Sequence, residues 1–211
     1  REELHPASDI DLLVLVAEGR LHAISESLVT LVGFLWDIGL EISHAVRSVD
    51  ECRREAEADV TVITNLIESR VITGQTTLFE QMRAAIAPSQ IWPSEAFFAA
   101  KCEEQRARWR KYGDTAYNLE PNIKENPGGL RDIQMIAWVT KRHFDADSLQ
   151  ELVTLGFLTD SEYKSLIEGQ ILLWRIRFAL HRLSGRCEDR LLFDYQRLLA
   201  DSFGFNDRND N

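Results

Sequence analysis

The first 75 residues switch between the hydrophobic periods of strands and helices. Residues 10–16, IDLLVLV, form a continuous apolar run of strand length, which predicts a buried strand. Residues 21–39 repeat apolar positions at helical spacing and end at a glycine, so we expect a helix that lies on a sheet. Residues 40–48 alternate apolar and polar positions, as a half-buried strand does. The pattern therefore predicts a small α/β unit up to about residue 75.

Beyond these residues the pattern is helical almost to the end of the chain. Ser48 stands three residues before Glu51, which is the spacing of a capping box and predicts a helix start. Residues 59–74 carry one apolar stripe and should form a helix up to Gly74. Further periodic stretches predict helices at about 76–86, 94–110, 130–143, 160–183 and 190–202. We divide the chain into a first domain, a helical domain and a disordered polar tail, over residues 1–75, 76–205 and 206–211.

The composition is that of an ordinary globular protein. The chain has 211 residues, of which 45% are hydrophobic, so it can bury a core. A net charge of -10 disfavours binding to nucleic acid or to an anionic membrane. No apolar run reaches the roughly 18 residues of a membrane helix, and we see no signal peptide. We therefore expect a cytoplasmic protein whose partner is a small molecule or another protein. The cysteines lack the spacing of a disulfide framework or a zinc site.

Two aspartates stand at the mouth of the first predicted strand. Asp9 and Asp11 project from the same side of a strand, whereas Ile10 points the other way into the core. Carboxylates held so close repel each other unless a cation lies between them, and Mg²⁺ bridged to substrate phosphates is a suitable occupant. Such a pair, with a third carboxylate, holds the metals of nucleotidyl transfer. A polar turn in which Ser8 or Asp9 bonds the backbone would also account for these residues.

Two residues compete for the place of the third carboxylate. Glu41 lies on the second predicted strand, where the strand period puts it on one face with Ser43. Asp59 precedes a strong helical pattern and would serve as an ordinary N-cap. We favour Glu41, although a solvent-facing glutamate on an edge strand would look the same in the sequence.

The stretch EPNIKENPGGLRDIQMIAW is the second informative motif. Gly128 and Gly129 permit close backbone approach and lead into a helical stripe. A glycine pair at a helix start exposes N–H groups that suit a phosphate, and Lys124 and Arg131 would add positive charge there. The alternative is a plain loop-to-helix turn in which Asp132 complements the helix dipole.

Two arginine-rich segments have simpler interpretations. Residues 103–115, EEQRARWRKYGDT, are interpreted as a solvated basic helix end. Residues 171–186, ILLWRIRFALHRLSGR, are interpreted as core aromatics flanked by surface arginines.

The opening ELHPASDIDLLVLV resembles the nucleotidyltransferase domain of the bacterial PII uridylyltransferase/uridylyl-removing enzymes. The stretches DVTVITNLIESRVITG, PNIKENPGGLRDIQMIAWV and RCEDRLLFDYQRLLADSFGF are similar to the same family, so the resemblance spans nearly the whole chain. A related PGGIRDIEF stretch occurs in glutamine synthetase adenylyltransferases. The resemblance implies an α+β fold, in which the small mixed sheet of a polymerase-β-like nucleotidyltransferase domain is followed by a helical bundle domain.

The resemblance also implies an activity and a set of site residues. The family transfers UMP from UTP to a tyrosine of the PII nitrogen-signalling protein, with Mg²⁺, and releases pyrophosphate. By resemblance, the metal and the chemistry belong to Asp9, Asp11 and Glu41. Nucleotide binding would fall to the residues of the two motifs, namely Ser8, Lys124, Gly128, Gly129, Arg131 and Asp132.

The family pattern also sets the alternatives. Its glycine-rich approach, GYGRxELHP, would begin upstream of Arg1, so we expect a fragment of a longer enzyme. In the family an HD hydrolase domain and ACT domains follow, and no His-Asp doublet occurs in these residues. Adenylyl transfer to glutamine synthetase and a catalytically silent nucleotide-sensing module are the rival functions. The HPASDID wording favours the uridylyl family, and the retained Asp9 and Asp11 argue against a silent module.

Overall fold

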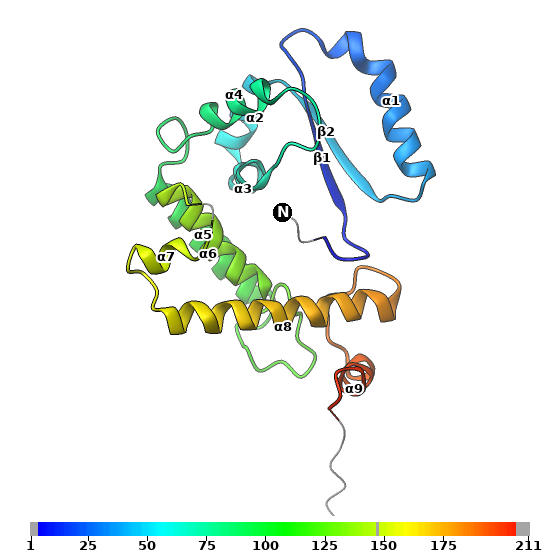
Figure 1. Ribbon diagram of the computed structural model, residues 1–211, viewed down its shortest axis with the longest axis vertical. Coiled ribbons are helices and arrows are strands. Elements are labelled where there is room, and N and C mark those ends of the chain that lie inside the picture. Colours follow the sequence, from blue (N-terminus) through cyan, green and yellow to red (C-terminus); the bar gives the residue numbers. More distant parts are fainter. Residues whose placement is uncertain (1–3, 147, 206–211) are drawn as a thin grey trace, which may run out of the picture. The chain divides into compact units, whose positions relative to one another are not determined.

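The structure is a computed structural model that describes residues 4–146 and 148–205. The described residues form two compact units, whose elements are labelled in Figure 1. The first unit is residues 8–100, and the second is residues 4–7 together with residues 101–205. The N-terminal residues 4–7 therefore group with the second unit, although the first strand follows them directly in the chain.

The first unit contains a two-stranded parallel sheet. Strands β1 (Ile10–Leu15) and β2 (Ile42–Arg47) pair in parallel, from Ile10 opposite Ile42 to Leu15 opposite Arg47. Parallel strands need a crossover connection, which helix α1 (Leu21–Asp37) supplies. The Trp36 ring of α1 lies edge-on to the His44 ring of β2, with centroids 6.2 Å apart.

Three helices complete the first unit. Helix α2 (Val49–Ala58) packs against both α3 (Val60–Glu68) and α4 (Thr76–Ala85). The expected capping box is confirmed, because the Ser48 hydroxyl accepts from the Glu51 N–H and the Glu51 carboxylate accepts from the Ser48 N–H. The side chains fully buried in this unit include Cys52, Ala56, Ile63, Met82 and Phe97.

Helix α3 ends earlier than its sequence pattern predicts. It stops at Glu68, and Ser69 has extended backbone angles of φ -64° and ψ 148°. The Ser69 hydroxyl donates to the Leu66 carbonyl at 2.6 Å. Serine offers the backbone such local hydrogen bonds in place of a further helical turn. The expected continuation to Gly74 is therefore wrong.

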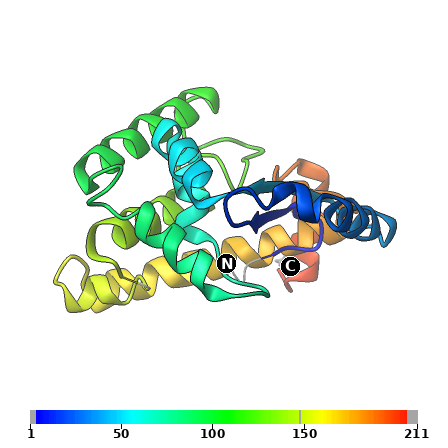
Figure 2. The same ribbon diagram turned by 90° about the horizontal axis from the view of Figure 1, so that it is seen from above.

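The second unit is helical. Helix α5 (Ser94–Lys111) begins in the first unit and continues into the second, followed by α6 (Leu130–Phe144) and the short α7 (Glu151–Thr154). Helix α8 (Asp160–Ser184), which runs straight in Figure 1 and Figure 2, contacts α6 and α9 (Phe193–Ser202). Their core is centred on the buried side chains Ile123, Leu180 and Leu199.

The predicted α+β fold class is confirmed. In the described part of the chain, the sheet consists of the parallel strands β1 and β2. Helix α7 was not expected, because four residues are too few to show a period. The domain boundary near residue 75 stays a prediction. The two compact units divide after residue 100, and α4 packs on α2 within the first unit. The expected disordered tail, residues 206–211, lies outside the described residues. Among the helices that the structure describes, none has both the length and the apolar character to cross a membrane.

Candidate functional site

The sheet register brings the predicted carboxylates to one face. Asp11 lies opposite Ser43 in the ladder, and the Ile10 N–H donates to the Glu41 carbonyl at 3.0 Å. Since paired residues in a sheet point to the same side, Asp11 and Ser43 share a face, and the alternation along the chain adds Asp9 and Glu41. The Ser43 hydroxyl donates a short hydrogen bond to the Asp11 carboxylate. The backbone therefore directs Asp9, Asp11 and Glu41 to one side of the sheet.

A shallow hollow of about 600 Å³ opens beside this face. Asp9, Glu41 and Ser43 line it together with residues from the end of α1 and the following turn, namely Trp36, Gly39, Leu40 and Ile42. The described lining contributes carboxylate and hydroxyl oxygens but no lysine or arginine. Oxygen ligands without a competing basic side chain suit a hard divalent cation such as Mg²⁺.

The three carboxylates share a face without meeting at a point. Asp9, Asp11 and Glu41 are exposed. Within the described residues, their oxygens do not form a set in which all atoms lie within 4.8 Å of one another. Exposed side chains change rotamer within nanoseconds, so a cation could gather them without movement of the backbone.

Asp59 is engaged elsewhere. Its carboxylate accepts from the Thr61 N–H at 2.6 Å and caps the start of α3, which confirms the expected capping role. Glu41 as the third carboxylate stays a prediction, which its place beside Asp9 in the hollow favours.

The glycine pair before α6 is required by the backbone. Gly128 has a φ of +80°, a region that residues with a side chain rarely adopt. A Cβ atom on Gly129 would lie 2.9 Å from each of three backbone carbonyl oxygens, those of Ile123, Lys124 and Asn126. Both glycines thus serve the tight turn itself.

The first N–H groups of α6 are already hydrogen-bonded. Gly129 N–H donates to the Asn126 carbonyl at 2.8 Å. Leu130 N–H donates to the Ile123 carbonyl at 3.0 Å, and Arg131 N–H donates to the carbonyl of residue 124 at 2.8 Å. The expectation that this helix start presents its N–H groups to a phosphate is therefore wrong, because the preceding loop folds back and uses them.

Asp132 joins the turn to α5. Its carboxylate accepts from the Gly128 N–H at 2.8 Å, from Gln105 Nε2 at 3.1 Å and from Trp109 Nε1 at 3.2 Å, and it forms an ion pair with Arg108 at 2.5 Å. The Arg108 side chain is 10% exposed. The interpretation of residues 103–115 as a solvated face is thus wrong for Arg108 and Trp109.

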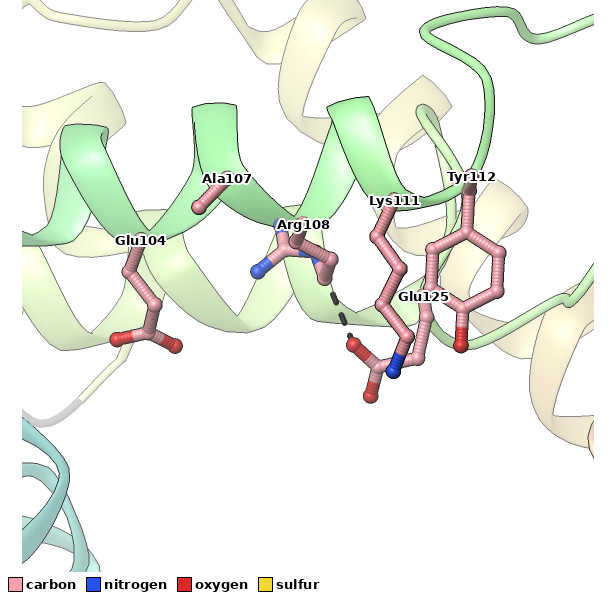
Figure 3. A pocket seen from close by; sticks show the side chains of 6 residues that line it. All are labelled: Glu104, Ala107, Arg108, Lys111, Tyr112 and Glu125. Atoms are coloured by element: carbon pink, nitrogen blue, oxygen red, sulfur yellow. Dashed lines mark ion pairs between the residues drawn. The ribbon is translucent and has the colours of Figure 1, made fainter.

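A second hollow, of about 520 Å³, lies beside these residues (Figure 3). Arg108 and Lys111 of α5 line it with Glu104 and Glu125, and Arg108 pairs with Glu125 at 3.8 Å. Lys101, buried nearby, donates to Glu104 at 2.5 Å. Burial lowers the pKa of Lys101 although Glu104 favours its charged form. The charges here balance one another, whereas the first hollow carries acidic charge alone.

Sequence reasoning missed a charged cluster around Asp189. Arg177 Nε donates to Asp189 at 2.6 Å, His181 Nε2 lies 3.2 Å from the same oxygen, and Lys124 Nζ lies 3.9 Å from the other. Burial alone would raise the pKa of Asp189, but Arg177, His181 and Lys124 together outweigh burial and lower it. The surface role expected for Arg177 is wrong. The signal in the sequence is the spacing of Arg177 and His181, four residues apart on one helix face.

The same cluster contains His181, Cys187 and Asp189. Among the residues that the structure describes, this is the one set of potential metal ligands whose ligand atoms all lie within 4.8 Å of one another. Both ring nitrogens of His181 are engaged, Nδ1 by the Ala7 N–H at 3.4 Å and Nε2 by Asp189. Asp189 is neutralised by Arg177 and a lysine. A cation would have to displace these partners, so the set does not fit a metal centre.

Comparison with known proteins adds independent evidence. The family model described as GlnD PII-uridylyltransferase matches residues 96–211. A bifunctional uridylyltransferase/uridylyl-removing enzyme of Methylococcus capsulatus is 56% identical over 205 residues, which cover 97% of this chain. Enzymes with the same description from Ectopseudomonas mendocina and Nitrosococcus oceani are 54% and 52% identical over 98% and 99% of the chain. The chain spans 23% of the length of each of these relatives. No solved structure matches the chain significantly.

Proposed function

The chain belongs to the GlnD PII-uridylyltransferase family, and from this premise we propose that it carries the site for Mg²⁺-dependent transfer of UMP from UTP to a tyrosine of the PII signalling protein, with release of pyrophosphate. The observation that supports this proposal most directly is the acidic sheet face formed by Asp9, Asp11, Glu41 and Ser43. An all-acidic hollow repels a free triphosphate, so nucleotide binding there requires a cation.

Each residue of the acidic face has a distinct role in the proposal. Asp9, Asp11 and Glu41 would hold Mg²⁺ through carboxylate oxygens, with the Ser43 hydroxyl orienting Asp11. When bound, Mg²⁺ neutralises the triphosphate and lowers the pKa of the attacking hydroxyl. The residues themselves position the phosphate chain relative to the hydroxyl, and most of the rate gain would come from that positioning.

We propose that Ser8 and Arg131, motif residues with a partly exposed polar group, make the nucleotide contacts outside this face. Ser8 directly precedes Asp9, and Arg131 has its guanidinium 3.4 Å from Glu125 and 3.1 Å from Gln134. The roles of Lys124, Gly128, Gly129 and Asp132 in the proposal are indirect, because their contacts hold the turn and the Asp189 cluster. The PII protein is the proposed partner.

The test is isothermal titration of the chain with UTP, ATP and CTP, each with and without Mg²⁺. We expect Mg²⁺-dependent binding of UTP that Asp9→Asn/Asp11→Asn reduces at least tenfold. The control Asp194→Asn/Asp201→Asn makes the same charge change on α9 and should bind UTP as the unaltered chain does. Preference for ATP would instead support the adenylyltransferase, and binding that ignores Mg²⁺ and the Asp9/Asp11 change would contradict the proposed site.

A further inference from the structure

The segment that leads into β1 is attached to α8. Residues 4–7 belong to the same compact unit as α8. The Ala7 N–H donates to His181 Nδ1 at 3.4 Å, a long hydrogen bond, and the His5 ring lies edge-on to the His181 ring with centroids 5.7 Å apart. Two residues of the segment, His5 and Ala7, therefore contact one buried histidine.

His181 is itself fixed in orientation and in tautomer. Its side chain is 0% exposed, and its Nε2 lies 3.2 Å from Asp189 Oδ1. Because Nδ1 accepts from Ala7, the ring proton must lie on Nε2, from which it is donated to Asp189. The imidazole is thus held between a backbone donor and a carboxylate acceptor.

Asp189 completes the support of this ring. Arg177 Nε donates to it at 2.6 Å, and Lys124 lies 3.9 Å from its second oxygen. Both Asp189 oxygens face cationic side chains, so this carboxylate is not available as a metal ligand. A continuous set of contacts thus runs from Arg177 and Lys124 through Asp189 and His181 to the backbone of Ala7.

The anchored backbone lies two residues before the first proposed metal ligand. Ala7 is followed by Ser8 and then by Asp9, and the chain enters β1 at Ile10. A carboxylate contributes to catalysis only when its direction is fixed to within a fraction of an ångström, and supporting residues supply that precision. Fixing the backbone at Ala7 removes freedom from the short link that carries Asp9.

We propose that His181 and Asp189 are positioning residues for Asp9, because together they anchor the Ala7 backbone that leads into the acidic face. This inference rests on the proposed function, since it assigns the role to the same site. It also gives Lys124 of the second motif a purpose that needs no direct nucleotide contact.

The first test of the anchor needs no activity measurement. Amide hydrogen exchange is followed by mass spectrometry in the peptide that spans residues 4–15, in the unaltered chain and in two His181 variants. His181→Leu keeps the bulk and loses the acceptor, and its peptide should exchange at least tenfold faster. His181→Asn offers an amide oxygen near the Nδ1 position and should restore most of the protection. The control His143→Leu, on the exposed face of α6, should change nothing.

The positioning role is tested second, through uridylyl transfer. We expect kcat to fall at least tenfold in His181→Leu with little change in KM for UTP, and to recover in His181→Asn. If His181→Leu does not fold, Ala7→Pro removes the N–H donor, leaves the Asp189 cluster untouched and should give the same two results. Unchanged exchange in the variants overturns the anchor, and faster exchange with unchanged kcat overturns the positioning role. Failure of the unaltered chain to bind nucleotide counts against the proposed function alone, because the exchange result stands by itself.

Discussion

Backbone packing around position 129 explains why this motif residue is a glycine. Three carbonyl oxygens would lie 2.9 Å from an added Cβ atom. These oxygens belong to the backbone and also accept the first hydrogen bonds of α6, so they cannot move aside cheaply. We therefore expect Gly129→Ala to lower the free energy of unfolding by about 2 kcal/mol or more, measured by urea denaturation.

A matched glycine in the same unit provides the control for this prediction. Gly169 lies inside α8 and has nothing within 4 Å of an added Cβ atom. Gly169→Ala should leave the unfolding free energy unchanged or raise it by about 0.5 to 1 kcal/mol, because alanine favours the helix. Equal effects of the two substitutions would contradict the close backbone approach at Gly129.

His5 makes a prediction about pH. Burial, with smaller contributions from Arg177 and the neighbouring His181, lowers the pKa of His5 from 6.5 to about 4. Between these values the unfolded chain binds a proton at His5 that the folded chain does not, so stability falls as the pH falls from 6.5 towards 4. With solvent screening of a partly exposed ring, we expect a loss of about 1 to 2 kcal/mol.

The comparison of variants isolates this contribution. Carboxylates such as Asp189 also change stability in acid, so the quantity to measure is the difference between the unaltered chain and His5→Asn. Urea denaturation at pH 7.0 and pH 4.5 should show a smaller loss of stability in the variant. An identical loss in both proteins would mean that His5 takes up its proton at the same pH in the folded and unfolded chain.

The sequence motifs predicted which residues are important better than they predicted what those residues do. The sequence marked Gly129, Asp132 and Lys124 as important, and each makes contacts that support its unit. Their assumed phosphate contacts could not be checked from spacing, because the loop that uses the α6 N–H groups is defined only by its fold. Asp9 and Asp11, in contrast, needed only strand alternation to be placed on one side.

Most helix starts were predicted accurately from the sequence, and the start of α2 leads to a testable prediction. The capping box at Ser48 satisfies two N–H groups, and the Ser48 side of α2 is buried, with Ser48 5% exposed. Ser48→Ala should therefore lower the unfolding free energy by about 1 kcal/mol or more, because the partly buried Glu51 N–H loses its acceptor. Ser27→Ala, at an exposed position inside α1, should have an effect below about 0.5 kcal/mol. A similar cost for both would rule out the cap as the cause.

Two helix boundaries differ from those that the sequence pattern predicts, one at a helix end and one at a helix start. Periodicity carried α3 to Gly74, but a local hydrogen bond of Ser69 ends the helix after Glu68. The start of α9 was expected at residue 190 and lies at Phe193, since Arg190 pairs with Asn122 in an isolated bridge. The deciding contacts are polar in both cases, a serine hydroxyl bond at α3 and backbone hydrogen bonds of the bridge before α9, and a hydrophobic pattern does not register them.

At the scale of the whole molecule, the contacts invisible to sequence are those between distant segments. Ala7 and His181 are 174 residues apart in the chain, and no sequence motif contains both of them. The fold class and the acidic face depend on local periods and on one strand pairing, so they could be predicted. The Asp189 cluster depends on tertiary packing of α8 against the loop at residues 121–126, so it could not.

Charge gives the last prediction, which concerns the absence of nucleic acid binding. The chain has 34 acidic against 24 basic residues. Several of its cations, including Lys101, Arg108 and Arg177, are largely buried in pairs with carboxylates and cannot contact a phosphate backbone. Electrostatic attraction to phosphates supplies nearly all non-specific affinity for DNA. We therefore expect a fluorescence anisotropy titration with a labelled 20-base-pair duplex, about two helical turns, to show no binding at about 0.15 M salt. Binding that weakens steeply with added salt would show that a basic surface exists despite the acidic total.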